Sequence, residues 1–160
     1  MYLIDSDVLI DAKNRHYAFD VVPAFWDWVA QQHLAGKVFV VQRVAEEILA
    51  GADELADWLK AQPASFKLVP TSADATSLAT VSQWALGAGY QQAAVAAFLQ
   101  AGDYFIVAQG LTLGYTVVTQ ERPEPASKKK IKIPDACDAV GVKWTTPFQM
   151  LKAEGARFTL

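Results

Sequence analysis

Four acidic residues stand where predicted strands end or where the following helices begin. Asp5 follows the apolar run Tyr2-Leu-Ile, and Glu121 closes the run Val117-Val-Thr-Gln. Parallel strands bring their carboxyl ends to one edge of a sheet, so acids far apart in the sequence can meet there. The candidate pocket of hard oxygen donors consists of Asp5, Glu47, Asp103 and Glu121.

Carboxylate oxygens favour hard divalent cations, whereas zinc sites usually include sulfur or imidazole ligands. Both histidines, His16 and His33, are distant in sequence from the acids, and we expect them on the surface or partly packed. The sequence contains no nucleophile elbow, CxxC pair, HExxH motif or glycine-rich phosphate loop. These observations favour metal-assisted chemistry.

The length of 160 residues suits one compact domain over residues 1–160, with enough apolar residues, 52%, to form a core. The lone Cys137 is expected to be a small buried hydrophobe, which fits a cytoplasmic setting. No apolar run approaches the ~20 residues that span a bilayer, and we expect neither a signal peptide nor a membrane partner.

The net charge of −3 provides no general attraction for nucleic acid. Any polyanionic substrate must therefore be held locally, by a metal ion or by a basic patch. The candidates for such phosphate or RNA contacts lie in one loop: Lys128, Lys129, Lys130 and Lys132.

Strands are predicted at residues 2–4, 38–41, 115–119 and 142–144, with residues 66–69 as a strand or an extended connection. Helices alternate with them, at about residues 23–35, 44–50, 55–59, 74–86, 92–99, 103–113 and 147–154. Residues 122–130 are predicted to form a surface loop and residues 131–134 an extended return. The alternation predicts a helix-rich α/β fold, a three-layer α/β/α sandwich with a mainly parallel sheet of four to five strands.

The acidic motifs, taken in order, resemble those of the PIN-domain nucleases, and among these the toxin-like ribonucleases of the VapC type. Three further stretches, 130–137, 14–17 and 25–28, resemble a less studied PIN-like branch, the DUF4411 family. The resemblance covers nearly the whole chain and implies a PIN-like fold. The motifs that carry it are Asp5-Ser-Asp7, Glu47-Ile-Leu-Ala-Gly51, Asp103-Tyr-Phe-Ile-Val-Ala108 and Thr119-Gln-Glu121.

The resemblance implies an endoribonuclease that depends on Mg²⁺ or Mn²⁺. Asp5 and Asp103 would bind the metal directly, while Glu47 and Glu121 complete its coordination or position a water. A bound metal polarises a phosphoryl oxygen and lowers the pKa of its water. The family usually has Asp at the position of Glu121, so the longer side chain here is expected to bind directly or through water.

Two further residues are expected to support the site. Asp7 would bind the metal, orient Asp5 or cap the following helix, and Thr119 would donate a hydrogen bond to a carboxylate or a water. The resemblance also implies a cognate antitoxin protein as partner, and a homodimer in many relatives. An exposed aromatic helix face around Phe25 and Trp28 is the expected dimer patch, whereas Trp26, Trp58 and Trp84 are expected in the core.

Two other functions remain open. A haloacid-dehalogenase-like phosphatase would use Asp5 as nucleophile and Asp7 as general acid, with Asp103 in its late metal motif, but it leaves Glu47 without a role. A non-catalytic PIN-like module would bind RNA or a partner protein without cleaving anything. Metal-dependent cleavage of RNA distinguishes the nuclease from both.

Overall fold

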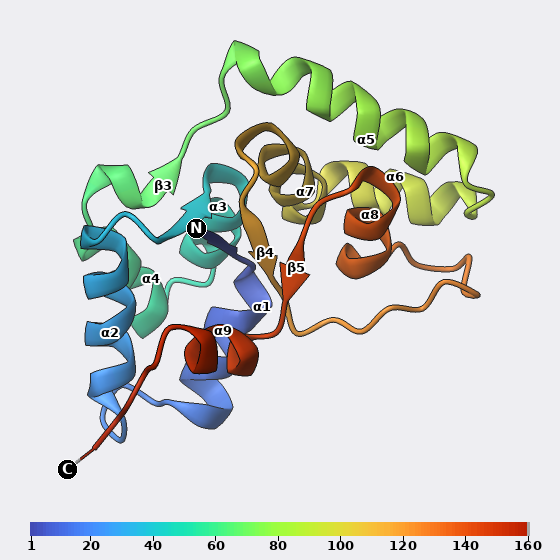
Figure 1. The fold of residues 1–160 in the computed structure, drawn as a ribbon. Helices are drawn as coiled ribbons and strands as arrows, with labels where there is room; N and C mark the ends of the chain where they lie inside the picture. Colours follow the sequence, from blue (N-terminus) through green and yellow to red (C-terminus); the bar gives the residue numbers. More distant parts are fainter. Residues whose placement is uncertain (160) are drawn as a thin grey trace.

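Five parallel strands form one sheet in the order β3-β2-β1-β4-β5 (Figure 1). The computed structural model describes residues 1–159. The strands are β1 (Tyr2–Ile4), β2 (Val38–Val41), β3 (Lys67–Leu68), β4 (Thr116–Val118) and β5 (Trp144–Thr145).

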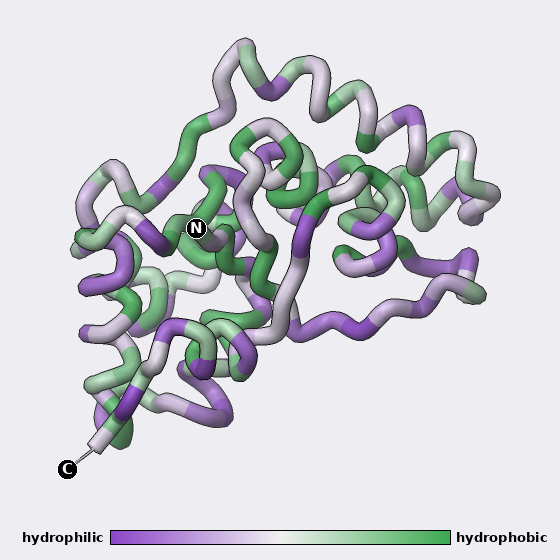
Figure 2. Tube along the Cα trace, in the orientation of Figure 1, coloured by the Kyte–Doolittle hydropathy of each residue, from purple (hydrophilic) through white to green (hydrophobic). Residues whose placement is uncertain are grey.

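The central strands are apolar and short. Leu3, Val38, Val40 and Val117 have no exposed surface, which is expected where helices cover both faces of a parallel sheet. Figure 2 shows the same distribution, with apolar residues on the central strands and hydrophilic residues concentrated in outer segments such as the loop after β4. The hydrophobic core therefore lies along the middle of the sheet.

Helices cover the sheet in a three-layer α/β/α arrangement, as the sequence predicts. α7 packs on β2 and β4 and contacts α3, α5, α6 and α8, whereas α2 contacts β2. The helices are α1 (Ser6–Asp11), α2 (Pro23–Leu34), α3 (Gln42–Ala50), α4 (Glu54–Ala61), α5 (Ala75–Gly87), α6 (Gln92–Gln100), α7 (Gly102–Leu113), α8 (Ile133–Val140) and α9 (Pro147–Ala153).

Helix ends follow local capping chemistry. Asp5 accepts a hydrogen bond from the Ser6 N–H at the start of α1, and Thr146 forms a capping box with Gln149 at the start of α9. Gly114 ends α7 with a φ of 69°, a left-handed conformation that favours glycine. The first of these signals places Asp5 at the start of α1.

The strand order reverses direction between β1 and β4. From β1 the chain moves outward to β2 and β3, then returns to pair β4 with the other side of β1. Ile4 lies opposite Val118 in the register of β1 and β4. In open parallel sheets, ligands bind beyond the carboxyl ends of the strands at such a point, so this edge is where a site is expected.

Two local expectations were wrong, and one element was not expected at all. Residues 131–134 do not return as an extended segment, because α8 begins at Ile133 with Pro134 in its first turn, where the missing N–H costs nothing. The last strand is Trp144–Thr145 rather than residues 142–144. Residues Ala12–His16 form a π-helix that the spacing of apolar residues did not indicate.

The aromatic face expected to be exposed is covered by the chain itself. Phe25 is 3% exposed and stacks on Tyr17, while Trp28 is half-buried against Phe158. Trp26 is buried in the core, and Trp58 and Trp84 pack against it, as expected. The patch around Phe25 and Trp28 is therefore not available for a partner.

Within residues 1–159, no single helix is long and apolar enough to cross a membrane, although α6 and α7 meet that test as a pair bent by 67°.

Candidate metal centre

Asp5 lies at the switch point of the sheet. Its N–H donates to the Val118 carbonyl at 3.0 Å, which continues the pairing of β1 with β4 by one residue. Its side chain is 3% exposed and accepts a hydrogen bond from the Ser6 N–H at 2.8 Å. Burial, followed by repulsion from Asp103 and Asp7, raises the pKa of Asp5 well above its usual value.

Glu47 reaches the same region from α3. Its Oε1 accepts a hydrogen bond from the Gly102 N–H at 2.7 Å, and its Oε2 accepts one from the Ser6 hydroxyl at 3.1 Å. Ser6 is next to Asp5 and Gly102 is next to Asp103, so the Glu47 carboxylate bridges the two segments that carry the other acids. Its neighbour Glu46 is turned elsewhere, toward Gln42 and Arg43.

Asp103 lies in the first turn of α7, where a negative charge favours the helix dipole. The side chain is half-buried. Burial, then repulsion from Glu121 and Glu47, raises its pKa to about 6, while Lys130 acts in the opposite direction. Asp103 and Asp5 therefore interact electrostatically with each other and with the remaining acids.

Glu121 is held at the start of α8. Its Oε2 accepts a hydrogen bond from the Ile133 N–H at 2.7 Å, and its Oε1 lies 3.4 Å from the Lys130 ammonium. Thr119 is fully buried, and its hydroxyl accepts a hydrogen bond from the Glu121 N–H at 3.1 Å. Thr119 thus fixes the turn that carries Glu121 and contacts no acidic side chain of residues 1–159.

Asp7 is exposed in the first turn of α1 and adds negative charge near Asp5 and Lys130. Among the four candidate lysines, Lys130 lies beside the acids. Burial would lower its pKa, but attraction from Glu121, Asp103 and Asp7 raises it overall. Lys128 lies over the Tyr90 ring, Lys132 lies 4.0 Å from Glu124, and Lys129 lines a surface hollow together with Lys130 and Asp103.

The structure therefore brings Asp5, Glu47, Asp103 and Glu121 to one edge of the sheet. Sequence reasoning missed Ser6 and Gly102, which position Glu47, although both are sequence neighbours of predicted acids. His33 is buried between the Val38 carbonyl and the Ser65 hydroxyl, and Cys137 is buried with a raised pKa; neither belongs to this cluster.

The donor chemistry of the cluster fits a hard cation. In the described chain, Asp5 has no ion-pair partner, although three other carboxylates, those of Asp103, Asp7 and Glu121, raise its pKa. As they stand, no three acidic, histidine or cysteine side chains in residues 1–159 meet closely enough to enclose a metal ion. Glu47 and Glu121 direct carboxylate oxygens toward the backbone N–H groups of Gly102 and Ile133.

Comparison with solved structures identifies the fold. The chain is similar to one in a structure of FitAB bound to an IR36 DNA fragment, with 17% identity, a TM-score of 0.58, and coverage of 92% of this chain and 96% of that chain. It is also similar to one in the crystal structure of FitAcB from Neisseria gonorrhoeae, with 18% identity, a TM-score of 0.59, and coverage of 92% and 99%. The fold is thus PIN-like.

No curated protein matches the sequence. A family model does: the one described as Domain of unknown function (DUF4411) matches residues 2–158. That match spans both ends of the sheet and all four acids, so the chain belongs to the DUF4411 family, with a PIN-like fold.

Proposed function

We propose that this protein is a metal-dependent endoribonuclease that hydrolyses RNA phosphodiester bonds, and that it is the toxin of a toxin–antitoxin pair in the cytoplasm. One observation carries the proposal. Asp5 is almost fully buried at the switch point of the sheet, faces further carboxylates, and has no cationic partner in the described residues. A buried carboxylate in such surroundings is costly unless a cation joins it.

The donor set suits Mg²⁺ or Mn²⁺, because all four side chains offer oxygen. Asp5 and Asp103 would hold the ion directly, while Glu47 and Glu121 would complete its coordination or hold a water. A bound ion would supply Lewis acidity toward a phosphoryl oxygen and lower the pKa of its water.

The residues around the acids have separate tasks. Ser6 and Gly102 keep Glu47 beside Asp5 and Asp103, and Thr119 holds the turn that carries Glu121. Lys130 is the cation nearest to the acids, and it would contact a phosphate of the RNA. Lys128, Lys129 and Lys132 would extend this contact along the loop. Asp7 would orient Asp5. The net charge of the chain is negative, so RNA binding would depend on these local cations.

Two partners follow from this proposal. As in other toxins of this fold, a cognate antitoxin protein would cover the acidic edge, and two copies of the chain would form a homodimer. The support is the PIN-like fold itself, together with the assembly of FitAB on DNA in the first comparison structure.

Cleavage of a labelled single-stranded RNA by purified protein tests the function. We expect cleavage with Mg²⁺ or Mn²⁺, none with EDTA, and a loss of at least about 100-fold in Asp5→Asn and in Asp103→Asn, because each removes a proposed ligand. Asp57→Asn is the matched control, since the Asp57 side chain is 80% exposed on α4. Cleavage that survives the double variant Asp5→Ala, Asp103→Ala would identify a contaminant and reject the nuclease.

The same preparations separate the two other functions. Hydrolysis of a phosphomonoester that is lost in Asp5→Asn, with RNA left intact, would indicate the phosphatase. RNA binding without cleavage in either metal would indicate a non-catalytic module.

A further inference from the structure

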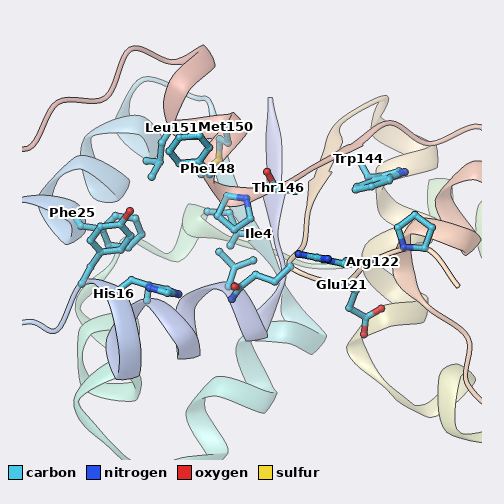
Figure 3. A pocket seen from close by; sticks show the side chains of 16 residues that line it. Ile4, His16, Phe25, Glu121, Arg122, Trp144, Thr146, Phe148, Met150 and Leu151 are labelled. Atoms are coloured by element: carbon cyan, nitrogen blue, oxygen red, sulfur yellow. The ribbon is translucent and has the colours of Figure 1, made fainter.

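A cavity of about 410 Å³ opens beside Glu121, and the start of the loop after β4, Arg122 and Pro123, forms part of its wall. Its walls come from the π-helix, from α2, and from the segments that follow β4 and β5. Figure 3 shows Phe25 and His16 on one side, Arg122 and Glu121 on the other, and Phe148 with Met150 and Leu151 along a further side. Its size is in the range of small-ligand pockets, ~300–1,000 Å³.

The cavity shares one residue, Glu121, with the proposed catalytic centre and lies next to a second, Asp5, along the chain. Glu121 lines it and also raises the pKa values of Asp5 and Asp103. Ile4, the residue before Asp5, forms part of the wall. A strand of nucleic acid with a phosphate at the acids would therefore have a neighbouring nucleotide at the mouth of this cavity.

We propose that this cavity receives one unpaired nucleobase of the RNA strand next to the phosphate that is cleaved. The proposal rests on the nuclease function above and adds to it the recognition of a single-stranded, unstacked substrate. Proteins bind such bases by stacking them on aromatic rings and guanidinium groups, while cations contact the backbone outside.

The aromatic walls are held in fixed positions. Tyr17 stacks on Phe25 with 4.4 Å between ring centroids and 12° between planes, and its carbonyl accepts a hydrogen bond from the Trp26 indole at 2.7 Å. Trp144, which also lines the cavity, donates its indole N–H to Asp138 at 2.9 Å, and this bond fixes the orientation of the ring. Fixed rings lose little entropy when a base stacks on them.

Phe148 lies at the cavity and is 69% exposed. An exposed aromatic ring at the mouth of a cavity offers a face on which a nucleobase can stack. Thr146, whose hydroxyl accepts the capping hydrogen bond of α9, anchors the helix that carries Phe148. A base seated in the cavity would bury this ring.

Arg122 gives the cavity a positive charge. Its side chain is exposed, and in the part of the chain that the structure describes it forms no ion pair. Gln120 binds the Asp7 carbonyl and the Asp11 carboxylate through its amide nitrogen, which leaves its carbonyl oxygen as an acceptor. A planar base with polar edges and an adjacent phosphate complements these groups, whereas an aliphatic protein side chain would not.

Binding measurements on the full chain test the cavity without cleavage. In an Asp5→Asn background with Mg²⁺, we would measure the affinity of a fluorescein-labelled 12-nucleotide oligouridylate and of an equally long spacer strand that carries no bases. Phe148→Ala should weaken binding of oligouridylate by about 5-fold to 150-fold and leave the spacer strand unchanged. Leu86→Ala is the matched control, because Leu86 is also 69% exposed and lies on α5.

Two further measurements test the contributions of Arg122 and Trp144 to the cavity. Arg122→Gln should lower the slope of log affinity against log salt by about 0.7, one phosphate contact on a single strand, and the exposed Arg157→Gln should not. Oligouridylate should quench tryptophan fluorescence in the parent protein, and Trp144→Phe should remove most of that quenching while retaining a ring at this position.

The outcomes separate this inference from the nuclease function. Equal oligouridylate affinity in Phe148→Ala and Leu86→Ala, with RNA still cleaved by the wild type, rejects the base site and leaves the nuclease standing. A weaker affinity in Phe148→Ala without any cleavage by the wild type supports the base site and rejects the nuclease. Loss of affinity for both strands in Phe148→Ala also rejects a base-specific contact.

Discussion

The Glu47 carboxylate and the Gly102 N–H are joined by a hydrogen bond of 2.7 Å that leaves no room for a side chain at position 102. A Cβ built on Gly102 would lie 2.9 Å from Glu47 Oε1 and 3.0 Å from a methyl group of Val44. The glycine therefore allows α3 and α7 to approach closely, and this approach places Glu47 beside Asp103.

Gly102→Ala is predicted to destabilise the protein although alanine favours helices. The overlap with Glu47 and Val44 forces a shift that typically costs about 1–3 kcal/mol, which outweighs a helix gain of at most about 1 kcal/mol. Displacement of Glu47 should also lower RNA cleavage. Urea unfolding and the cleavage assay measure the two effects.

Gly87→Ala provides the control for this substitution. Gly87 ends α5, and a Cβ there would meet nothing within 4 Å. We expect this variant to be as stable as the wild type or more stable, by up to about 1 kcal/mol. If Gly102→Ala unfolds at the same urea concentration as Gly87→Ala, the close approach of α3 and α7 is not a constraint.

The metal-free protein is predicted to become less stable as the pH rises through the range in which Asp103 ionises. Because the pKa of Asp103 is raised from 3.8 to about 6, the folded protein keeps a proton that the unfolded chain has already lost. The free energy of unfolding therefore falls between these pH values, by about 1–3 kcal/mol, and does not recover above pH 6. Asp103→Asn should reduce this fall when unfolding is followed in EDTA at pH 4.5 and 7.5.

The control is Asp57→Asn, which alters an exposed acid outside the cluster. It should show the same decrease between pH 4.5 and 7.5 as the wild type. A wild-type protein that is more stable at pH 7.5 than at pH 4.5 without metal would contradict the electrostatic account of the cluster.

Mn²⁺ or Mg²⁺ is predicted to stabilise the wild type and not the variants that lack a ligand. A cation that binds only the folded state raises the free energy of unfolding by about 2.7 kcal/mol at 100 times its Kd. Asp5→Asn and Asp103→Asn should each abolish the rise in melting temperature on titration with Mn²⁺. A rise of equal size in both variants would place the cation elsewhere.

Glu154→Gln is predicted to weaken the attachment of α9 to the sheet. Glu154 accepts hydrogen bonds from Lys37 at 2.6 Å and from the Tyr2 hydroxyl at 3.0 Å, and the bond from Lys37 is the main cause of its lowered pKa. The pair is partly exposed, so we expect a loss of about 0.5–1 kcal/mol at pH 7. The contribution is present above the usual pKa of 4.5 and disappears as the pH falls through the lower folded value.

Thermal unfolding at pH 7 and pH 3.5 checks this prediction. Wild type and Glu154→Gln should differ at pH 7, and the difference should be smaller at pH 3.5. Lys152→Gln changes an exposed charge on the same helix and should behave as the wild type at both pH values.

The sheet could be predicted because its strands are buried on both faces. Runs such as Val38–Val41 are uniformly apolar and bounded by Gly36 and a helix start. Their strand conformation can therefore be predicted from local sequence with little knowledge of long-range contacts. α8 escaped prediction because its sequence opens with Ile133, Pro134 and Asp135 after a lysine-rich loop, which resembles an extended return. The start of α8 at Ile133 is marked in the structure by a tertiary contact, the hydrogen bond from the Ile133 N–H to the Glu121 carboxylate.

The sequence could predict which acids lie together in the candidate site, but it could not predict the hydrogen bonds that position them. Asp5 and Asp103 stand at helix starts that local sequence reveals, and strand order then brings them together. The contacts of Glu47 with Ser6 and Gly102 depend on how closely α3 and α7 pack, which residue spacing does not encode. The aromatic cavity likewise depends on the π-helix Ala12–His16, which the spacing of apolar residues does not predict.

The pairing of β1 with β4 has a consequence for synthesis. β1 is synthesised before β4, the strand that completes its second side and ends at Val118, and Glu121 follows still later. Until then Asp5 lacks the hydrogen bond from its N–H to Val118 and the opposing turn at Thr119. The acidic edge of a nascent chain therefore cannot assemble until the segment that runs through β4 to Glu121 has been synthesised.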